Sequence, residues 1–167
     1  PPPAEAPKPT PERLQALNAE YLALIRQGRE PEAQAAFSRL VSESLVARSL
    51  SLRFLFGPDS TQFLPDAVLL RRYDSWLAEV ARQLGSSSQC LQLVGHASRS
   101  GSDAANRRIS LARAETVKQV LLKHGPGLGP RLLTVGMGVA KPMPGRGAND
   151  PGDAADRRVE LRVIDCP

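Results

Sequence analysis

Three groups of residues in this sequence are of types that catalysis uses, but none has the spacing that its chemistry requires. Gly136 and Gly138 follow an apolar stretch, as in a dinucleotide-binding turn, yet the third glycine is missing and prolines follow where a helix would have to start. The serines of GHASRSG, residues 95–101, lack the spacing of a nucleophile elbow. His96 and His124 lie far apart without a cluster of carboxylates around them, so no set of metal ligands is apparent. We therefore expect no enzymatic activity, no cofactor and no metal site.

The positive charge of the chain is a second chemical feature, because it favours an anionic partner. The sequence has 22 Lys and Arg against 17 Asp and Glu, a formal net charge of +5, and residues 1–48 are neutral, so the whole excess follows Ser49. Nucleic acid, acidic lipid and cell-wall carboxylates are candidate partners, and a codon bias towards arginine is the alternative explanation. Nucleic acid is disfavoured, because the 4 Phe, 2 Tyr and 1 Trp occupy expected core positions and leave few platforms for base stacking.

The first 48 residues predict two segments. Proline makes up six of residues 1–11, which is typical of an extended linker. Residues 12–48 carry apolar side chains at helical spacing on both sides of Gly28, which predicts a helical hairpin. Two interpretations remain open: the hairpin resembles one tetratricopeptide unit, or it docks on the domain that follows. The second is favoured because such repeats normally stack at least about three deep.

Residues 49–167 alternate between strand and helix patterns and predict one domain. We expect Ser110 to cap its second helix and Gly125 to end it. The expected elements are strands at 50–57, 90–96, 132–138 and 157–164, helices at 66–84 and 111–124, and a loop at 139–156. The order βαβαββ predicts an α/β chain, more closely an α+β sandwich in which two helices pack on one face of a mixed four-stranded sheet.

The segment GHASRSGSDAANRRISLARAETVKQVLLKHG, followed by RLLTVGMGVAKP and GDAADRRVELRV, resembles the OmpA-like peptidoglycan-binding domain. That family has the pattern GHTDxxGxxxxNxxLSxxRAxxVxxxLxxxG, then GxGxxxP, then GRAxNRRVEI. The opening FLFGPDSTQFLPDA is similar to the family's first strand and loop, so the resemblance covers about residues 50–165.

The resemblance implies a binding site for the diaminopimelate residue of the peptidoglycan stem peptide. That ligand presents an ammonium and a carboxylate, so an acid and an arginine are needed. The family's arginine falls on Arg113, which we expect in the first turn of a helix beginning at Ser110, with Asn106 beside it and Arg157 or Arg158 at the rim. The family's aspartate position is occupied by Ser98, whose neutral hydroxyl weakens binding about tenfold or more.

Two acids replace other residues of the family pattern near its end. Asp153 stands where the family has arginine, and Asp156 stands where it has asparagine. Either can compensate for the acid missing at Ser98, and Asp103 is a weaker candidate. The favoured alternative is that Asp153 and Asp156 pair with Arg157 or Arg158 at the surface.

The same alignment places Cys90 at the start of the second strand and Cys166 at the end of the fourth. If these strands are antiparallel neighbours, the two cysteines lie at the same edge of the sheet, and we expect a disulfide between them; two free thiols are the less favoured alternative.

The resemblance leads to two functional hypotheses. The first is a non-enzymatic periplasmic anchor that binds peptidoglycan and tethers an envelope protein or complex to the cell wall of a Gram-negative bacterium. The second is a protein-interaction module that has lost wall binding and docks another envelope protein, with the hairpin as part of its surface. A peptidoglycan hydrolase is a distant third. No apolar run approaches the ~20 residues of a membrane span, so attachment to the inner or outer membrane would depend on a segment upstream of Pro1.

Overall fold

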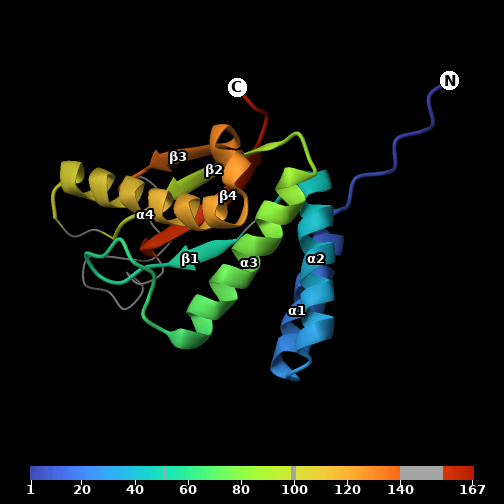
Figure 1. The fold of residues 1–167 in the computed structure, drawn as a ribbon, viewed down its shortest axis with the longest axis horizontal. Coiled ribbons are helices and arrows are strands. Elements are labelled where there is room, and N and C mark those ends of the chain that lie inside the picture. Colours follow the sequence, from blue (N-terminus) through green and yellow to red (C-terminus); the bar gives the residue numbers. More distant parts are fainter. Residues whose placement is uncertain (51, 99–100, 140–155) are drawn as a thin grey trace. The chain divides into compact units, whose positions relative to one another are not determined.

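A computed structural model describes residues 1–50, 52–98, 101–139 and 156–167 of the chain. Within it the chain divides into two compact units, Pro1–Leu50 and Ser51–Pro167 (Figure 1). Each unit has its own secondary structure, and each is described by itself below.

The first unit is an extended segment followed by two helices, as the sequence predicted. The helices are α1 (Pro11–Arg26) and α2 (Glu30–Ala47). Thr10 caps α1 by accepting a hydrogen bond from the Arg13 backbone N–H. Gly28 adopts a φ of 69° in the connecting turn, a conformation that glycine reaches without steric cost. The rings of Tyr21 and Phe37 lie 5.3 Å apart and join the two helices.

The second unit has the predicted order of strands and helices, and its fold class is confirmed. Its elements are β1 (Arg53–Leu55), α3 (Ala67–Gly85), β2 (Cys90–Gly95), α4 (Asp103–His124), the 3₁₀ helix η1 (Pro126–Arg131), β3 (Leu132–Gly136) and β4 (Arg158–Ile164). The short helix η1 was not predicted. Strand β1 is shorter than the expected 50–57, and Phe56, directly after it, forms an isolated antiparallel bridge with Phe63.

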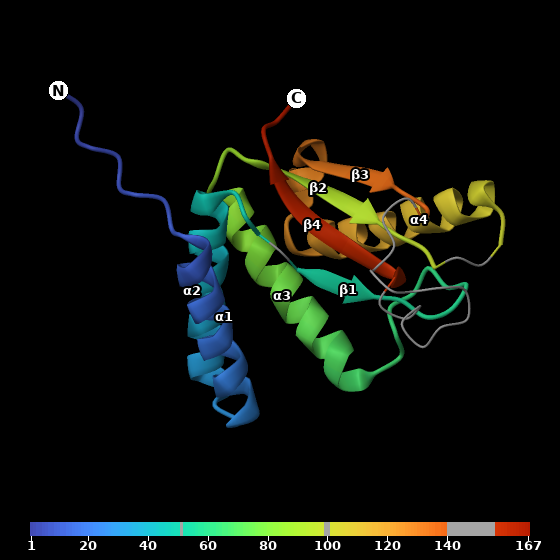
Figure 2. The same ribbon diagram turned by 180° about the vertical axis from the view of Figure 1, so that it is seen from behind.

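The four strands form one mixed sheet in the order β1-β4-β2-β3. Strand β4 runs antiparallel to both β1 and β2, and β2 runs parallel to β3. Figures 1 and 2 show α3 and α4 together on one side of this sheet. Side chains alternate between the two faces of a strand, so the apolar set of each strand faces the helices. The buried apolar residues on that face are Phe54, Leu91, Leu93, Val159 and Leu161.

Helix α4 begins eight positions earlier than the sequence predicted. Ser102, and not Ser110, is its cap, since the Ser102 hydroxyl accepts a hydrogen bond from the Ala105 N–H. Ser110 lies inside the helix, where its hydroxyl donates to the Arg107 carbonyl and accepts from the Gly138 N–H. The first two turns of α4 are mostly polar, so the spacing of apolar residues did not predict that they are helical. Arg113 therefore lies in the middle of α4, and the helix N-terminus does not contribute to its surroundings.

The backbone of α4 lies directly against the sheet at Gly95. A Cβ atom added to Gly95 would lie 1.8 Å from the Ser110 carbonyl oxygen, which belongs to a hydrogen-bonded helix and cannot move freely. A Cβ at Gly136 would lie 2.7 Å from the Arg107 carbonyl oxygen. Only glycine permits this approach, and the approach sets the depth at which the side chains of α4 enter the fold.

We expect Gly95→Ala to lower the free energy of unfolding of the second unit by more than about 3 kcal/mol, because the added methyl group has no space. Gly85→Ala is the matched control, since a Cβ at Gly85 meets nothing within 4 Å. Denaturant unfolding followed by the fluorescence of Trp76, the single tryptophan, measures both variants. Equal stability of the two variants would contradict this packing.

A disulfide joins Cys90, the first residue of β2, to Cys166, two residues beyond the end of β4. The two Cα atoms are 5.1 Å apart and the cysteines are separated by 76 positions. Cys90 pairs with Ile164 in the sheet, and Cys166 lies two residues beyond that partner. The bond thereby fixes the end of β4 to a central strand.

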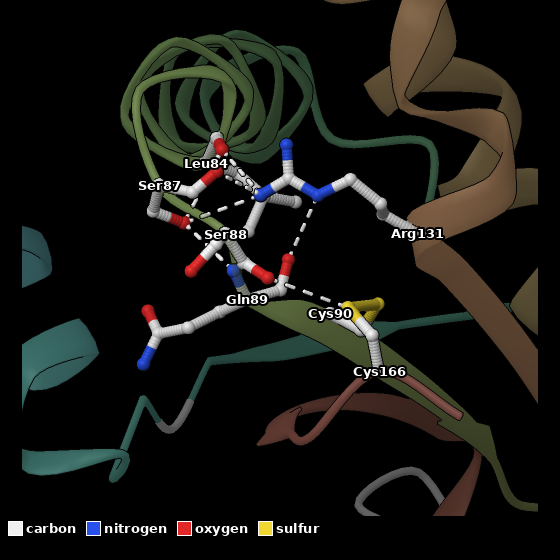
Figure 3. Close-up of a disulfide and its surroundings, with 7 residues drawn as sticks. All are labelled: Leu84, Ser87, Ser88, Gln89, Cys90, Arg131 and Cys166. Atoms are coloured by element: carbon white, nitrogen blue, oxygen red, sulfur yellow. Dashed lines mark hydrogen bonds between the residues drawn. A yellow bond between two sulfur atoms is a disulfide. The ribbon is translucent and has the colours of Figure 1, made fainter.

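Arg131 strengthens the same corner of the fold (Figure 3). Its Nη2 donates to the carbonyl oxygens of Leu84 and Ser87, at 2.6 and 2.7 Å, and its Nε donates to the Gln89 carbonyl at 2.9 Å. These carbonyls belong to the end of α3 and to the turn into β2, where a cation is also favoured by the helix dipole. The Arg131 side chain thus stabilises the turn between α3 and β2, and β2 begins at Cys90.

Replacing both cysteines with alanine is expected to lower the free energy of unfolding by about 4 kcal/mol, as the entropy of closing a loop of this length predicts. Reduction of the wild-type protein should give the same loss. Mass spectrometry after alkylation without reduction checks the bond itself. Two alkylated thiols in freshly purified protein that has not been exposed to a reductant would show that the cysteines are free.

Candidate functional site

Two of the predicted site residues, Arg113 and Arg157, lie at one end of the sheet, where β1 and β2 end and β4 begins. The Phe56 N–H donates to the Arg157 carbonyl at 3.0 Å, and the His96 N–H donates to the Arg158 carbonyl at 2.8 Å. These two hydrogen bonds extend the sheet by one residue on each strand. We call this region the sheet-end site and define it by Phe56, His96 and Arg157, together with Arg113 from α4.

Arg113 is the centre of the sheet-end site and is 1% exposed. Its Nε donates to the Ser60 carbonyl at 2.8 Å, its Nη1 to the His96 carbonyl at 3.1 Å, and its Nη2 to the Gly57 carbonyl at 3.1 Å. The guanidinium carbon also lies 5.6 Å from the centre of the Phe56 ring, within the range of a cation–π interaction. The side chain therefore ties the loop after β1 to the end of β2.

Two cations lie near each other in this site. Burial and, to a smaller extent, the positive charge of Arg157 lower the pKa of Arg113 to about 10, against an opposing effect of Asp59. Arg113 nevertheless remains protonated at neutral pH. Arg157, which is less deeply buried, is held by its Nε, 3.3 Å from the Phe56 carbonyl oxygen. A site with two neighbouring guanidinium groups favours an anion such as a carboxylate.

The loop that follows β1 is fixed by contacts with α4. Residues 57–60 form a turn in which the Ser60 N–H donates to the Gly57 carbonyl at 3.2 Å. Arg113 donates to the carbonyls at both ends of this turn. Thr116, one turn further along α4, donates to the Thr61 carbonyl at 2.8 Å. The loop is thus held in place by two side chains of one helix.

Arg158 does not lie at the rim, and this corrects the sequence expectation for that residue. Neighbouring residues of a strand face opposite sides of the sheet, so Arg157 is on the side of Arg113 and Arg158 is on the other. Arg158 is 5% exposed, and its Nε donates to Glu160 at 2.7 Å. Asp156 is 1% exposed and lies 3.8 Å from the Arg158 guanidinium. The expected pairing of Asp156 therefore exists, but inside the protein and not at its surface.

The other predicted residues are placed as follows. Ser98, three residues after the end of β2, and Asn106, on the same face of α4 as Arg113, are both buried. Asp103 is exposed in the first turn of α4, where a carboxylate stabilises the helix dipole. Asp153 lies outside the described residues.

Asp59 is a residue of this region that the sequence reasoning missed. It occupies the tip of the turn 57–60 with a φ of 48°, and it is exposed. Its charge acts on Arg113. The sequence feature that could have identified it is the pair Pro58-Asp59 shortly after the first strand, since proline followed by aspartate is typical of a turn. Among the described residues, no group of three or more His, Cys, Asp and Glu side chains is arranged to hold a metal ion.

Glu160, which accepts a hydrogen bond from Arg158, has a lowered pKa. Burial is the largest single effect and raises this pKa. The hydrogen bond and charge of Arg158, with smaller effects of His96 and Arg53, together outweigh burial, so the net shift is downward. A carboxyl whose pKa is lowered by folding stabilises the protein above its unfolded pKa, and that stabilisation is lost as the pH falls through the folded value.

Glu160→Gln is therefore expected to flatten the dependence of unfolding free energy on pH below about pH 4.5, the ordinary glutamate value. Glu32→Gln, at an exposed position of α2, is the control and should keep the wild-type slope. Urea unfolding at a series of acidic pH values measures both. An unchanged acid slope in Glu160→Gln would contradict the role of this carboxylate.

Curated relatives match part of the chain. Outer membrane porin F of Pseudomonas fluorescens is 40% identical over 73 residues, which are 44% of this chain and 22% of that protein. Outer membrane porin F of Pseudomonas aeruginosa is 36% identical over 87 residues, 52% of this chain and 24% of that protein. The chain thus matches about a quarter of the length of these relatives.

Solved structures share the fold of the second unit. The peptidoglycan-associated lipoprotein from Burkholderia pseudomallei has a TM-score of 0.58 and 24% identity, covering 67% of this chain and 89% of that chain. A periplasmic domain of MotB from Helicobacter pylori has a TM-score of 0.53 and 14% identity, covering 70% and 76%. The cell wall anchor of the T6SS from Pseudomonas aeruginosa has a TM-score of 0.50 and 23% identity, covering 70% and 80%.

The family model described as the OmpA family matches residues 55–157, which include the sheet-end site, the helices α3 and α4, and the strands β2 and β3. This match covers more than half of the chain and agrees with the βαβαββ fold that these solved structures share. The chain therefore belongs to the OmpA family.

Proposed function

We propose that this chain is a non-enzymatic anchor that binds the stem peptide of peptidoglycan and tethers an envelope protein or complex to the cell wall. Membership of the OmpA family supports this proposal. Two structures with the same fold are named as a peptidoglycan-associated lipoprotein and a cell wall anchor. The ligand we propose is the diaminopimelate residue, whose free end carries one carboxylate and one ammonium.

The observation that carries the proposal is the pair of cations at the sheet-end site. Arg113 and Arg157 lie near enough for the charge of one to lower the pKa of the other. Within the described parts of the chain, neither forms an ion pair with a carboxylate, and their hydrogen-bond acceptors are neutral main-chain carbonyls. A carboxylate of the stem peptide would supply the missing negative charge.

The residues of the site have different parts in this proposal. Arg157 is the more exposed of the two cations and would pair directly with the ligand carboxylate, whereas buried Arg113 would hold the loop and add charge. Asn106 would contribute an amide beside them. Ser98 would accept a hydrogen bond from the ligand without balancing its charge, and such neutral bonds are weaker than charge-assisted ones.

A second candidate function is a protein-interaction module that has kept the fold and lost wall binding. Two observations favour it: Ser98 stands in place of the family's acid, and all three nitrogens of Arg113 already donate to the main chain. In that case Arg113 is retained for the structure of the loop. The helices α1 and α2 would then contribute a surface for another envelope protein.

We further propose that the chain works in the periplasm of a Gram-negative bacterium, tethered to the inner or outer membrane. The disulfide between Cys90 and Cys166 supports an oxidising compartment. In the part of the chain that the structure describes, no helix combines the length and apolar character needed to cross a membrane.

Co-sedimentation with insoluble peptidoglycan sacculi tests the proposal. We expect the wild type to pellet and Arg157→Gln to bind about tenfold more weakly, because a charge-assisted pair is lost. Arg162→Gln is the matched control, since Arg162 lies on the same strand but on the opposite face, 3.6 Å from Glu160. It should pellet like the wild type.

Ser98→Asp separates the two candidate functions. Under the anchor proposal this variant pellets at least as strongly as the wild type, because it restores an acid to the site. If the wild type stays in the supernatant and only Ser98→Asp pellets, the wall-binding site has been lost and the interaction module is the correct function.

A further inference from the structure

We propose that Asp59 provides the carboxylate that receives the ammonium group of the ligand, in place of the acid that is missing at Ser98. This inference rests on the proposed binding of diaminopimelate and names the residue that completes the site. The site would then recognise an ammonium and a carboxylate together, as at the end of an amino acid.

The first argument is the way in which Asp59 is held. The turn 57–60 carries Asp59 at its tip, and Arg113 donates hydrogen bonds to the carbonyls of Gly57 and Ser60, one on each side of Asp59. The buried guanidinium therefore fixes the position of the acid relative to the cations. Thr116 fixes the next residue, Thr61, to the same helix. A carboxylate on such a turn is preorganised for a ligand.

The second argument is that the Asp59 carboxylate remains available. Asp59 is exposed and, within the described residues, forms no ion pair, although it is near enough to Arg113 for its charge to raise the pKa of that arginine. An acid that had been used to neutralise Arg113 would make a direct contact. Asp59 instead adds an exposed negative charge near the buried cation Arg113, and a ligand with both charges requires an acid and a cation in one site.

The third argument comes from the other acids near the site. Asp156 is buried and paired with Arg158, and Glu160 accepts a hydrogen bond from Arg158 on the opposite face of the sheet. Asp103 is exposed at the start of α4, where it stabilises the helix. Among the acids that the structure describes, Asp59 is the one whose charge raises the pKa of Arg113.

Isothermal titration calorimetry with meso-diaminopimelate and with pimelate tests the inference, because pimelate has the carboxylates but neither ammonium. In the full chain, Asp59→Asn should weaken the binding of meso-diaminopimelate about tenfold or more and leave the binding of pimelate unchanged or stronger. Asparagine tolerates a positive φ, so the turn should be kept, and an unchanged melting temperature confirms this.

Two further variants make the test specific. Asp103→Asn removes the same charge at an exposed position and should bind meso-diaminopimelate like the wild type. Adding Ser98→Asp to Asp59→Asn should restore the lost affinity, because it returns an acid to the family's usual position.

The outcomes separate this inference from the proposed function. If Asp59→Asn binds meso-diaminopimelate as tightly as the wild type, Asp59 is not the ammonium partner, and the anchor function stands. If the wild type binds neither meso-diaminopimelate nor sacculi, both proposals are wrong.

Discussion

The burial of one guanidinium group, that of Arg113, determines the geometry of this domain's functional end. Its three nitrogens donate to main-chain carbonyls of the loop after β1 and of the residue after β2. The close approach of α4 to the sheet at Gly95 places Arg113 at the required depth. One side chain therefore connects the helix, the loop and the end of the strand.

A buried cation without a paired carboxylate is costly, and burial accordingly lowers the pKa of Arg113. Three carbonyl acceptors and the Phe56 ring offset part of this cost. The neighbouring charge of Arg157 adds to it. The folded domain therefore gains from any anion that binds here, and this links binding to stability: a ligand carboxylate would raise the melting temperature as it occupies the site.

The two ends of the sheet have different roles. At one end, β2 begins at Cys90, and the disulfide and Arg131 fix the corner between α3 and the sheet. At the other end, β2 leads to His96, and the cations and the turn with Asp59 are gathered there. A covalent bond and a hydrogen-bonded corner thus stabilise the end opposite the site. The site itself can keep like charges close together because stability is supplied elsewhere.

Local patterns in the sequence determined the order of elements, the family and the importance of Arg113, because periodicity, turn residues and motif spacing act over short stretches of chain. They did not predict the beginning of α4, because its first turns are polar and Ser110 is as suitable a capping residue as Ser102, which is the observed cap. Tertiary structure alone decided that Arg157 faces the site while Arg158 is buried behind it, since this depends on which face of β4 the helices cover. It also decided that the turn carrying Asp59, which is 54 positions from Arg113, is hydrogen-bonded to that arginine, because hydrogen bonds between distant segments leave no pattern in the sequence.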